Sequence, residues 1–118
     1  MMKQMLNSKI HGAVVTARHV EYDGSITIDR ELMDAAGLLV YEKVLVADME
    51  NANRFETYVI EGEPGGGAIE VNGAAAHLSK VGNRLIILSF ALVDESGADS
   101  IKPVIIRVDE KNKIISSG

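Results

Sequence analysis

The fold class of this chain is decided by the stretch Arg84-Leu85-Ile86-Ile87-Leu88-Ser89-Phe90-Ala91-Leu92-Val93. Apolar residues occupy both its odd and its even positions, so an extended strand there presents apolar side chains on both faces. Such a strand is typical of the centre of a β-barrel or β-sandwich, where both faces are covered. The stretch therefore predicts a mainly-β protein.

Shorter extended segments lie on both sides of this stretch. We expect strands within residues 5–17, 26–28, 44–46, 54–60, 68–71 and 103–108. A short helix should begin after the N-cap residue Asp29 and end at Gly37, and a second helical turn should cover residues 74–77. Loops are expected at residues 22–25, 51–53, 62–67 and 94–100. About seven short strands with two helical turns make a barrel or a sandwich.

The composition excludes several classes of function. The length of 118 residues predicts one domain over residues 1–118. With 12 Lys and Arg against 17 Asp and Glu, the formal charge is −5. This charge argues against nucleic acid as a partner, and so against a swapped-hairpin DNA-binding barrel, because phosphate binding needs a basic face. The absence of cysteine excludes disulfides, thiolate metal sites and a cysteine nucleophile.

No segment predicts a membrane span or a secretory signal. The longest apolar run, residues 85–88, is far shorter than the roughly 20 residues that cross a bilayer. Lys3, Gln4 and Asn7 interrupt any apolar region near the N-terminus. We therefore expect a cytoplasmic protein without a membrane partner.

Two pairs of residues could bind an anion. Lys9 and His11 are two apart on an expected strand and therefore share a face, and Arg54 and Tyr58 share a face of another strand. Two cations, an imidazole and a phenol could bind a carboxylate, with the phenol available as an acid. From spacing alone, an ordinary solvated surface is the favoured interpretation.

Small residues mark two further places. Asn72-Gly73-Ala74-Ala75 either begins a helical segment whose free backbone N–H groups could meet a carboxylate, or forms an Asn-capped turn packed by alanines. Gly24-Ser25 lies in a turn, where a serine hydroxyl held against the preceding carbonyl can attack it. Most Gly-Ser turns are inert, so this pair gains weight only from its context.

Two other patterns predict no chemistry. Gly65-Gly66-Gly67 is followed neither by Gly-Lys-Ser/Thr nor by a helix, so it is interpreted as a flexible turn and not as a phosphate-binding loop. The histidines His11, His19 and His77 have no short metal-ligand spacing, so no metal site is expected.

Five motifs follow one another along the chain: Lys9-Ile10-His11, Tyr22-Asp23-Gly24-Ser25, Asp34-Ala35-Ala36-Gly37, Asn53-Arg54-Phe55-Glu56-Thr57-Tyr58 and Val71-Asn72-Gly73-Ala74-Ala75-Ala76-His77. Each motif alone is weak. Together, in this order and at these separations, they resemble the pyruvoyl-dependent aspartate 1-decarboxylases, which make β-alanine for pantothenate biosynthesis. The resemblance extends from Met5 to Val108.

The resemblance implies a fold and an assembly. Members of this family form a six-stranded double-psi β-barrel with short helices and assemble as homotetramers with active sites at subunit interfaces. Some members need an accessory protein to mature. We therefore expect the same barrel, a homotetramer, and an accessory maturation protein among the candidate partners.

The resemblance also implies that the chain is a proenzyme that cuts itself between Gly24 and Ser25. The products are a β chain of residues 1–24 and an α chain of residues 25–118, and Ser25 becomes a pyruvoyl group, the expected cofactor. Thr57 is expected to hold the Gly24 carbonyl oxygen during this step. Because Arg54 and Tyr58 lie on the opposite face of an ideal strand, this role requires a bulge or a bend near Thr57.

For the mature enzyme, the resemblance implies decarboxylation of L-aspartate to β-alanine through an imine with the pyruvoyl ketone. The expected catalytic residues are Ser25 and Tyr58, the latter as the proton donor. The expected substrate contacts are Lys9, His11, Arg54, Thr57, Asn72, Gly73, Ala74 and Ala75. The alternative is a non-catalytic β-barrel module that binds an anionic ligand or a protein partner.

Overall fold

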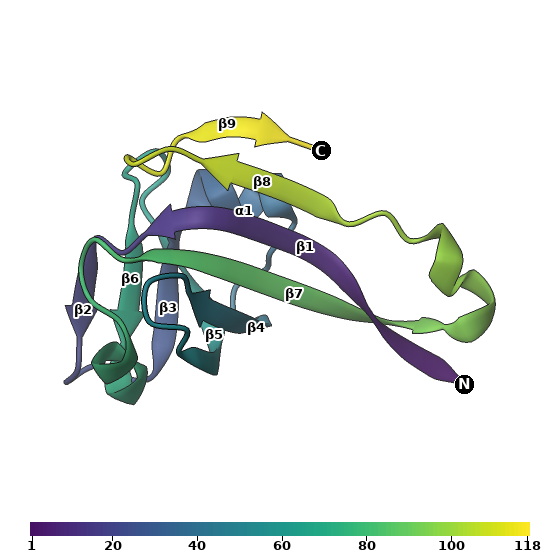
Figure 1. The fold of residues 1–118 in the computed structure, drawn as a ribbon, viewed down its shortest axis with the longest axis horizontal. Helices are drawn as coiled ribbons and strands as arrows, with labels where there is room; N and C mark the ends of the chain where they lie inside the picture. Colours follow the sequence, from purple (N-terminus) through teal and green to yellow (C-terminus); the bar gives the residue numbers. More distant parts are fainter.

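Nine β-strands form one continuous hydrogen-bonded sheet in the computed structural model, which describes residues 1–118 (Figure 1). The strands are β1 (Met2–Val14), β2 (Ala17–His19), β3 (Ser25–Asp29), β4 (Lys43–Asp48), β5 (Arg54–Gly62), β6 (Ile69–Asn72), β7 (Arg84–Asp94), β8 (Val104–Val108) and β9 (Ile114–Ser117). The helices are α1 (Arg30–Ala36) and the 3₁₀ helices η1 (Gly73–Leu78) and η2 (Glu95–Ser100). The expected mainly-β fold with short helices is confirmed. No helix is both long enough and apolar enough to cross a bilayer.

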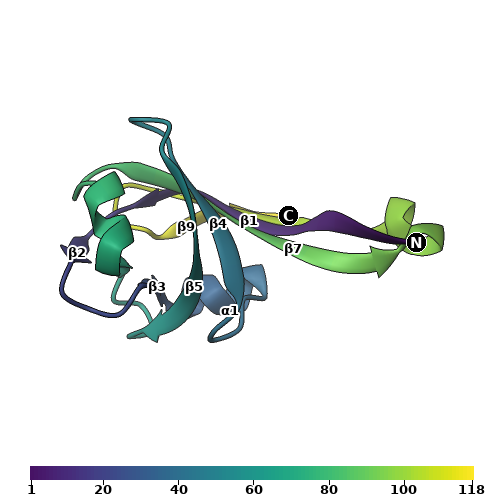
Figure 2. The same ribbon diagram turned by 90° about the horizontal axis from the view of Figure 1, so that it is seen from below.

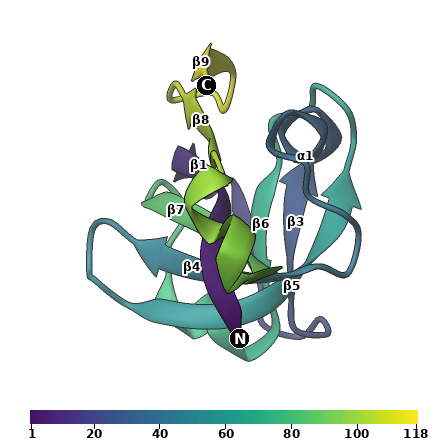
Figure 3. The ribbon, with the colours of Figure 1, turned by 90° about the vertical axis from the view of Figure 1, so that its right-hand side faces the viewer.

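The strands are ordered β2-β6-β3-β5-β4-β7-β1-β8-β9 across the sheet. Three neighbouring pairs, β1–β8, β2–β6 and β3–β5, are parallel, and the others are antiparallel. Seen along the long β1–β7 ribbon, the strands curve around a common core, with α1 beside β3 (Figure 3). A mixed and curved sheet is compatible with a double-psi barrel; the psi topology itself stays a prediction.

The core is one cluster of 19 buried apolar residues. Alternation along β3 decides which of its side chains belong to this cluster. Ile26 and Ile28 are fully buried in it, whereas Ser25 and Thr27 project from the opposite face of the strand. Ser25 therefore begins a core strand while its hydroxyl stays outside the apolar cluster.

The helix α1 begins and ends where the sequence predicts. Asp29 is the N-cap residue, with its carboxylate accepting the Glu31 N–H at 2.9 Å, and Gly37 ends the helix with a φ of 74°. The same carboxylate accepts the N–H groups of Gly65 and Gly67 at 2.9 and 2.8 Å. The glycine-rich loop, expected as a flexible turn, is thus anchored to the start of α1.

The strands β1 and β7 form a ribbon that extends beyond the rest of the sheet, with η2 at its far end (Figure 2). In the first half of β7, Leu85 and Ile87 are buried in the core. From residue 89 onward β7 pairs only with β1, and Phe90 and Leu92 are 41% and 68% exposed. The expectation of a strand covered on both faces is therefore wrong for this half of the segment.

Three short elements differ from the expected pattern. The strands β2 and β9 contain only three and four residues, too few for apolar alternation to indicate a strand. Residues 95–100, expected as a loop, form η2, and the Asp94 side chain accepts the Ser96 N–H at the start of this helix. Strands as short as β2 and β9 depend on the strands they pair with more than on their own residues.

Candidate active site

Ser25 lies in the wall of an open pocket of about 540 Å³. Three neighbouring strands build this wall, because β3 pairs with β6 on one side and with β5 on the other. Ser25 lies opposite Asn72 of β6. On the other side Val59 of β5 is the partner of Ile26, so Tyr58 comes next to Ser25. The remaining lining residues are residues 21–23, Tyr41 and Ile60.

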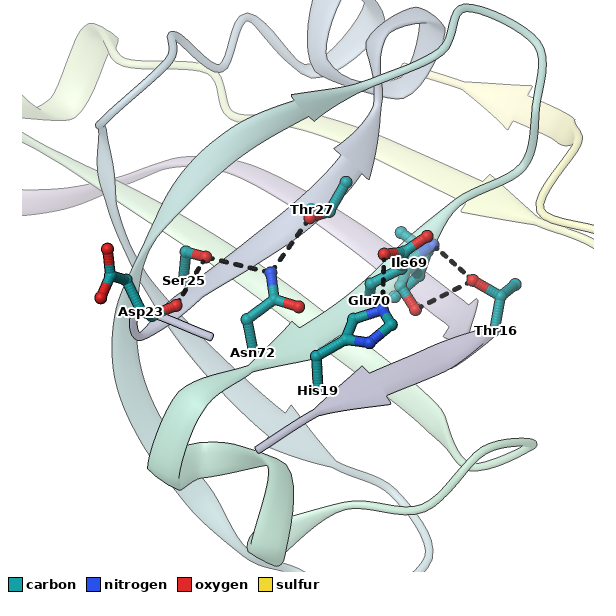
Figure 4. A network of polar contacts seen from close by, with 8 residues as sticks. All are labelled: Thr16, His19, Asp23, Ser25, Thr27, Ile69, Glu70 and Asn72. Atoms are coloured by element: carbon teal, nitrogen blue, oxygen red, sulfur yellow. Dashed lines mark hydrogen bonds and ion pairs between the residues drawn. The ribbon is translucent and has the colours of Figure 1, made fainter. Parts of the chain in front are cut away.

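Hydrogen bonds fix the Ser25 hydroxyl in this pocket (Figure 4). Asn72 Nδ2 donates to Ser25 Oγ at 3.0 Å and to Thr27 Oγ1 at 3.1 Å. The Ser25 hydroxyl donates to the main-chain oxygen of Asp23 at 3.2 Å. Ser25 is only 3% exposed. Its hydroxyl is therefore held beside the Gly24–Ser25 peptide and does not rotate freely in solvent.

The Asn72 side chain is buried, and its amide donates a hydrogen bond to Ser25 instead of capping the helix that follows. Asn72 precedes η1 but makes no side-chain capping hydrogen bond, so the interpretation as an Asn-capped turn is wrong. Its Oδ1 is buried and has no hydrogen-bond partner. An unpaired buried acceptor is unfavourable, so a donor group entering here would be stabilised by Asn72.

Gly73 packs directly against the backbone before Ser25. Its φ of +78° favours glycine, and a Cβ on Gly73 would lie 2.6 Å from Gly24 Cα and 2.8 Å from Gly24 N. After it, η1 presents Ala74 at the surface and Ala75 half-buried. The small residues after Asn72 thus allow η1 and the loop before Ser25 to approach closely.

Tyr58 lines the Ser25 pocket, whereas Arg54 does not. Tyr58 is 37% exposed, and its ring centroid is 6.2 Å from that of Tyr41. Arg54 lies on the same face but at the start of β5, opposite Ala47 of β4, whereas Tyr58 lies in the middle of the strand. At about 3.3 Å per residue, four residues separate the two backbone positions by roughly 13 Å. A shared face therefore does not bring Arg54 to the pocket.

Thr57 also lies outside the Ser25 pocket. The Thr57 role requires a bulge or a bend in β5, and the β4–β5 register runs from Arg54 to Tyr58 without a shift, so no bulge is present there. Thr57 lines a neighbouring depression together with Lys43, Glu56 and Tyr58, and it makes no hydrogen bond to Gly24. The contact between Thr57 and the Gly24 carbonyl is not formed within one chain.

Lys9 and His11 share a face of β1, as expected, but they do not line the Ser25 pocket. His11 lines a second cavity of about 390 Å³ with Arg84 and Arg107. Burial, and then the positive charges of Arg107, Lys9 and Arg84, lower the pKa of His11, because each disfavours the imidazolium form. His11 Nδ1 is buried without a hydrogen-bond partner.

The structure adds three lining residues that sequence reasoning missed: Glu21, Tyr41 and Ile60. Glu21 directly precedes the Tyr22-Asp23-Gly24-Ser25 motif, and this adjacency is the signal that could have indicated it. Tyr41 lies in the connection between α1 and β4 with a φ of 73°, uncommon for a residue other than glycine. No motif in the sequence marks Tyr41 or Ile60.

Comparison with known proteins gives matches over nearly the whole chain. A family model described as aspartate decarboxylase matches residues 1–115. A Thermoanaerobacter pseudethanolicus protein named aspartate 1-decarboxylase is 50% identical over 116 residues, which cover 98% of this chain and 99% of that protein. A protein of the same name from Acetivibrio thermocellus is 52% identical over 112 residues, or 95% of this chain and 89% of that protein.

Proposed function

Because this chain belongs to the aspartate decarboxylase family, we propose that it cuts itself between Gly24 and Ser25 and then converts L-aspartate to β-alanine and carbon dioxide. The observation that carries the proposal is the Ser25 hydroxyl, which is held beside the Gly24–Ser25 peptide by Asn72 and the Asp23 carbonyl. The product would serve pantothenate biosynthesis. A non-catalytic β-barrel module loses its support, because the relatives that cover nearly the whole chain are named as enzymes.

The proposed cleavage uses only groups of this chain and water. Ser25 Oγ bonds to the Gly24 carbonyl carbon, and the C–N bond breaks, which leaves an ester and a free Ser25 amine. Loss of the Ser25 α-proton then breaks the Cβ–O bond and releases the Gly24 carboxylate. Water replaces the amine of the dehydroalanine left at residue 25, with loss of ammonia, and a pyruvoyl group remains.

The residues around Ser25 fit a pyruvoyl group. Asn72 Nδ2 already donates to an oxygen of residue 25, and the buried Asn72 Oδ1 is free to accept from an amine. The group supplies an electrophilic ketone and an electron sink, which ordinary side chains do not provide. Tyr58, in the same pocket, is proposed to return a proton to the substrate Cα after carbon dioxide leaves.

Other residues are proposed to bind the substrate. Arg54 has a planar guanidinium that can hold a carboxylate through two hydrogen bonds. Lys9 would add positive potential, which an acidic chain must supply locally to attract a dicarboxylate. His11, whose lowered pKa favours the neutral imidazole, would contribute a hydrogen bond. Thr57 and the backbone of residues 73–75 complete the proposed contacts.

We further propose a homotetramer in which neighbouring subunits complete each active site. In one chain Lys9, Arg54 and Thr57 do not line the Ser25 pocket, so another copy has to bring them there. The exposed Phe90 and Leu92 on β7 provide apolar surface for contact between subunits. Sedimentation of the active protein tests this assembly, and a monomer that turns over L-aspartate would contradict it.

Mass spectrometry of the denatured protein tests the cleavage. Wild type should yield residues 1–24 and residues 25–118, the latter with a pyruvoyl end, and should release carbon dioxide from L-aspartate. Ser25→Ala should stay whole and inactive, whereas Ser89→Ala, which removes a buried hydroxyl outside the pocket, should be cut. Wild type that stays whole after prolonged warming, both alone and with cell extract, would overturn the proposal. Cleavage only with extract would identify a need for an accessory maturation protein.

A further inference from the structure

Three linked side chains, Glu70, His19 and Tyr22, connect β6 to the segment just before the proposed cleavage point. The Tyr22 ring stacks on the His19 ring, with centroids 4.6 Å apart and an angle of 20° between the planes. His19 Nε2 lies 3.1 Å from Glu70 Oε1 on β6 (Figure 4). Glu70 is thus connected, through His19, to the residue two positions before Gly24.

The strand that carries His19 is itself anchored to the fold. β2 pairs in parallel with β6, where His19 lies opposite Asn72. Arg18 Nη1 donates to the carbonyl oxygens of Ala76 and Ser79 at 3.1 and 3.0 Å. Carbonyls at a helix end lack partners within the helix, so Arg18 satisfies these groups and ties β2 to η1. His19 therefore holds Tyr22 against a fixed part of the molecule.

The Tyr22 side chain is mostly open to solvent, and its aromatic contact is the stack on His19. Tyr22 is 63% exposed, and its N–H donates to the His19 carbonyl at 3.2 Å. The Tyr22 carbonyl and the Gly24 backbone both lie beside Gly73. A shift of Tyr22 therefore moves the backbone that leads into the Gly24–Ser25 peptide. Intramolecular attack depends steeply on such placement, and a displacement of about 1 Å can cost roughly a hundredfold in rate.

We propose that Glu70 and His19 form a clamp on Tyr22 that positions the Gly24–Ser25 peptide for self-cleavage. This inference rests on the self-cleavage proposed above. His19 and Glu70 touch no reacting atom, so both are positioning residues. The clamp acts before the pyruvoyl group exists, and it controls how fast the precursor matures.

Cleavage kinetics of four variants test the clamp. Freshly purified precursor is followed by intact mass over time for wild type, His19→Ala, His19→Phe, Glu70→Gln and the control His77→Ala. His19→Ala removes both the stack on Tyr22 and the hydrogen bond to Glu70 and should slow cleavage about tenfold. His19→Phe keeps an aromatic ring for Tyr22 and should be cut within about threefold of the wild-type rate. Glu70→Gln keeps both the His19 ring and a polar partner for it, so its cleavage rate should lie between those of wild type and His19→Phe.

His77→Ala is a matched control. His77 is an exposed histidine on η1 with no hydrogen bond, so its loss should leave the cleavage rate unchanged. A second readout separates positioning from general loss of structure. Once fully cut, His19→Ala should keep a kcat and KM for L-aspartate within about threefold of wild type. Neither His19 nor Glu70 lines the Ser25 pocket, and cleavage separates residue 25 from the segment that carries the lining residue Tyr22.

The outcomes distinguish this inference from the function on which it rests. If wild type is cut and His19→Ala is cut at the same rate, the clamp is overturned and self-cleavage stands. Equal slowing in His19→Ala and His19→Phe, together with a lower unfolding temperature in both, also overturns the clamp, because the stack then has no specific role. A wild-type chain that is never cut overturns both proposals.

Discussion

Gly73 and Gly24 are in direct contact through their backbones, and no side chain fits between them. The contact joins the start of η1 to the loop before Ser25, two segments that are far apart in the sequence. Because Asn72 holds the Ser25 hydroxyl while Gly73 supports Gly24, two consecutive residues fix both sides of the proposed cleavage point.

Gly73→Ala should therefore slow the proposed self-cleavage. The new Cβ would lie 2.6 Å from Gly24 Cα, and a φ of +78° disfavours alanine, so the loop has to move. We expect cleavage to slow at least about tenfold, measured by intact mass. Gly97→Ala is the control, because its Cβ would meet no atom within 4 Å. Normal cleavage of Gly73→Ala would show that the close contact is dispensable.

Asn72→Ala should slow cleavage by roughly ten- to a hundredfold, since it removes the donor to Ser25 Oγ. Asn72 also donates to Thr27 Oγ1, so Thr27→Val separates the two bonds by leaving Asn72 and Ser25 in place. We expect Thr27→Val to be cut within a few-fold of the wild-type rate. Equal rates for Asn72→Ala and wild type in a gel-based time course would contradict this role for Asn72.

Tyr58→Phe should be cut normally but should decarboxylate L-aspartate roughly 10²–10⁴-fold more slowly, because it lacks the proposed proton donor. Tyr41 lines the same pocket, with its ring 6.2 Å from that of Tyr58. Tyr41→Phe therefore removes a neighbouring hydroxyl as a control and should keep most of the activity. The measurement is carbon dioxide release per pyruvoyl group, and the same small loss in both variants would exclude Tyr58 as the donor.

Asp48 should make the stability of the fold depend on acid pH. Burial alone would raise its pKa, but hydrogen bonds from Asn83, Ser79 and the N–H groups of Glu50 and Asn51 outweigh burial and lower the pKa. A carboxyl whose pKa is depressed by folding stabilises the protein at neutral pH, and this stabilisation is lost as the pH falls below about 4.

Asp48→Asn should therefore lower the free energy of unfolding by about 2–3 kcal/mol at pH 7 and flatten its decrease toward acid pH. Urea denaturation between pH 7 and pH 3 measures both effects. Asp99→Asn, a change at an exposed carboxyl, is the control and should leave the curve unchanged. If the free energy of unfolding of Asp48→Asn depends on pH as that of wild type does, the buried Asp48 carboxylate is not the cause of the loss of stability in acid.

The sequence predicts the local features of this fold well. The N-cap Asp29, the helix stop at Gly37 and the strand around Ile26 each depend on neighbouring residues, and all three are found in the structure. The placement of Tyr58 beside Ser25 depends instead on the β3–β5 pairing, which spacing along the chain does not reveal. The resemblance indicated these two residues together.

The remaining differences between the expected and the observed site concern which side chains lie close together in space. Arg54 and Tyr58 share a face, but a strand extends about 3.3 Å per residue, so only Tyr58 lines the pocket. His19 and Glu70 are 51 residues apart, and only the β2–β6 pairing brings them together. The rise per residue alone separates Arg54 from Tyr58, but which of the two lies beside Ser25, and that His19 meets Glu70, depends on pairing between strands.

The position of β1 between β7 and β8 has a consequence for the protein after the proposed cleavage. Residues 1–24 include an interior strand of the sheet, so cleavage leaves this short chain bound through both neighbours. The kinetic order of the folding reaction, however, differs between the precursor and the cut protein. The precursor folds as one chain, whereas the cut protein, once denatured, has to reassemble from separate chains and does so more slowly as it is diluted. Each molecule thus folds as a single chain only once, before the proposed cleavage separates residues 1–24 from residues 25–118.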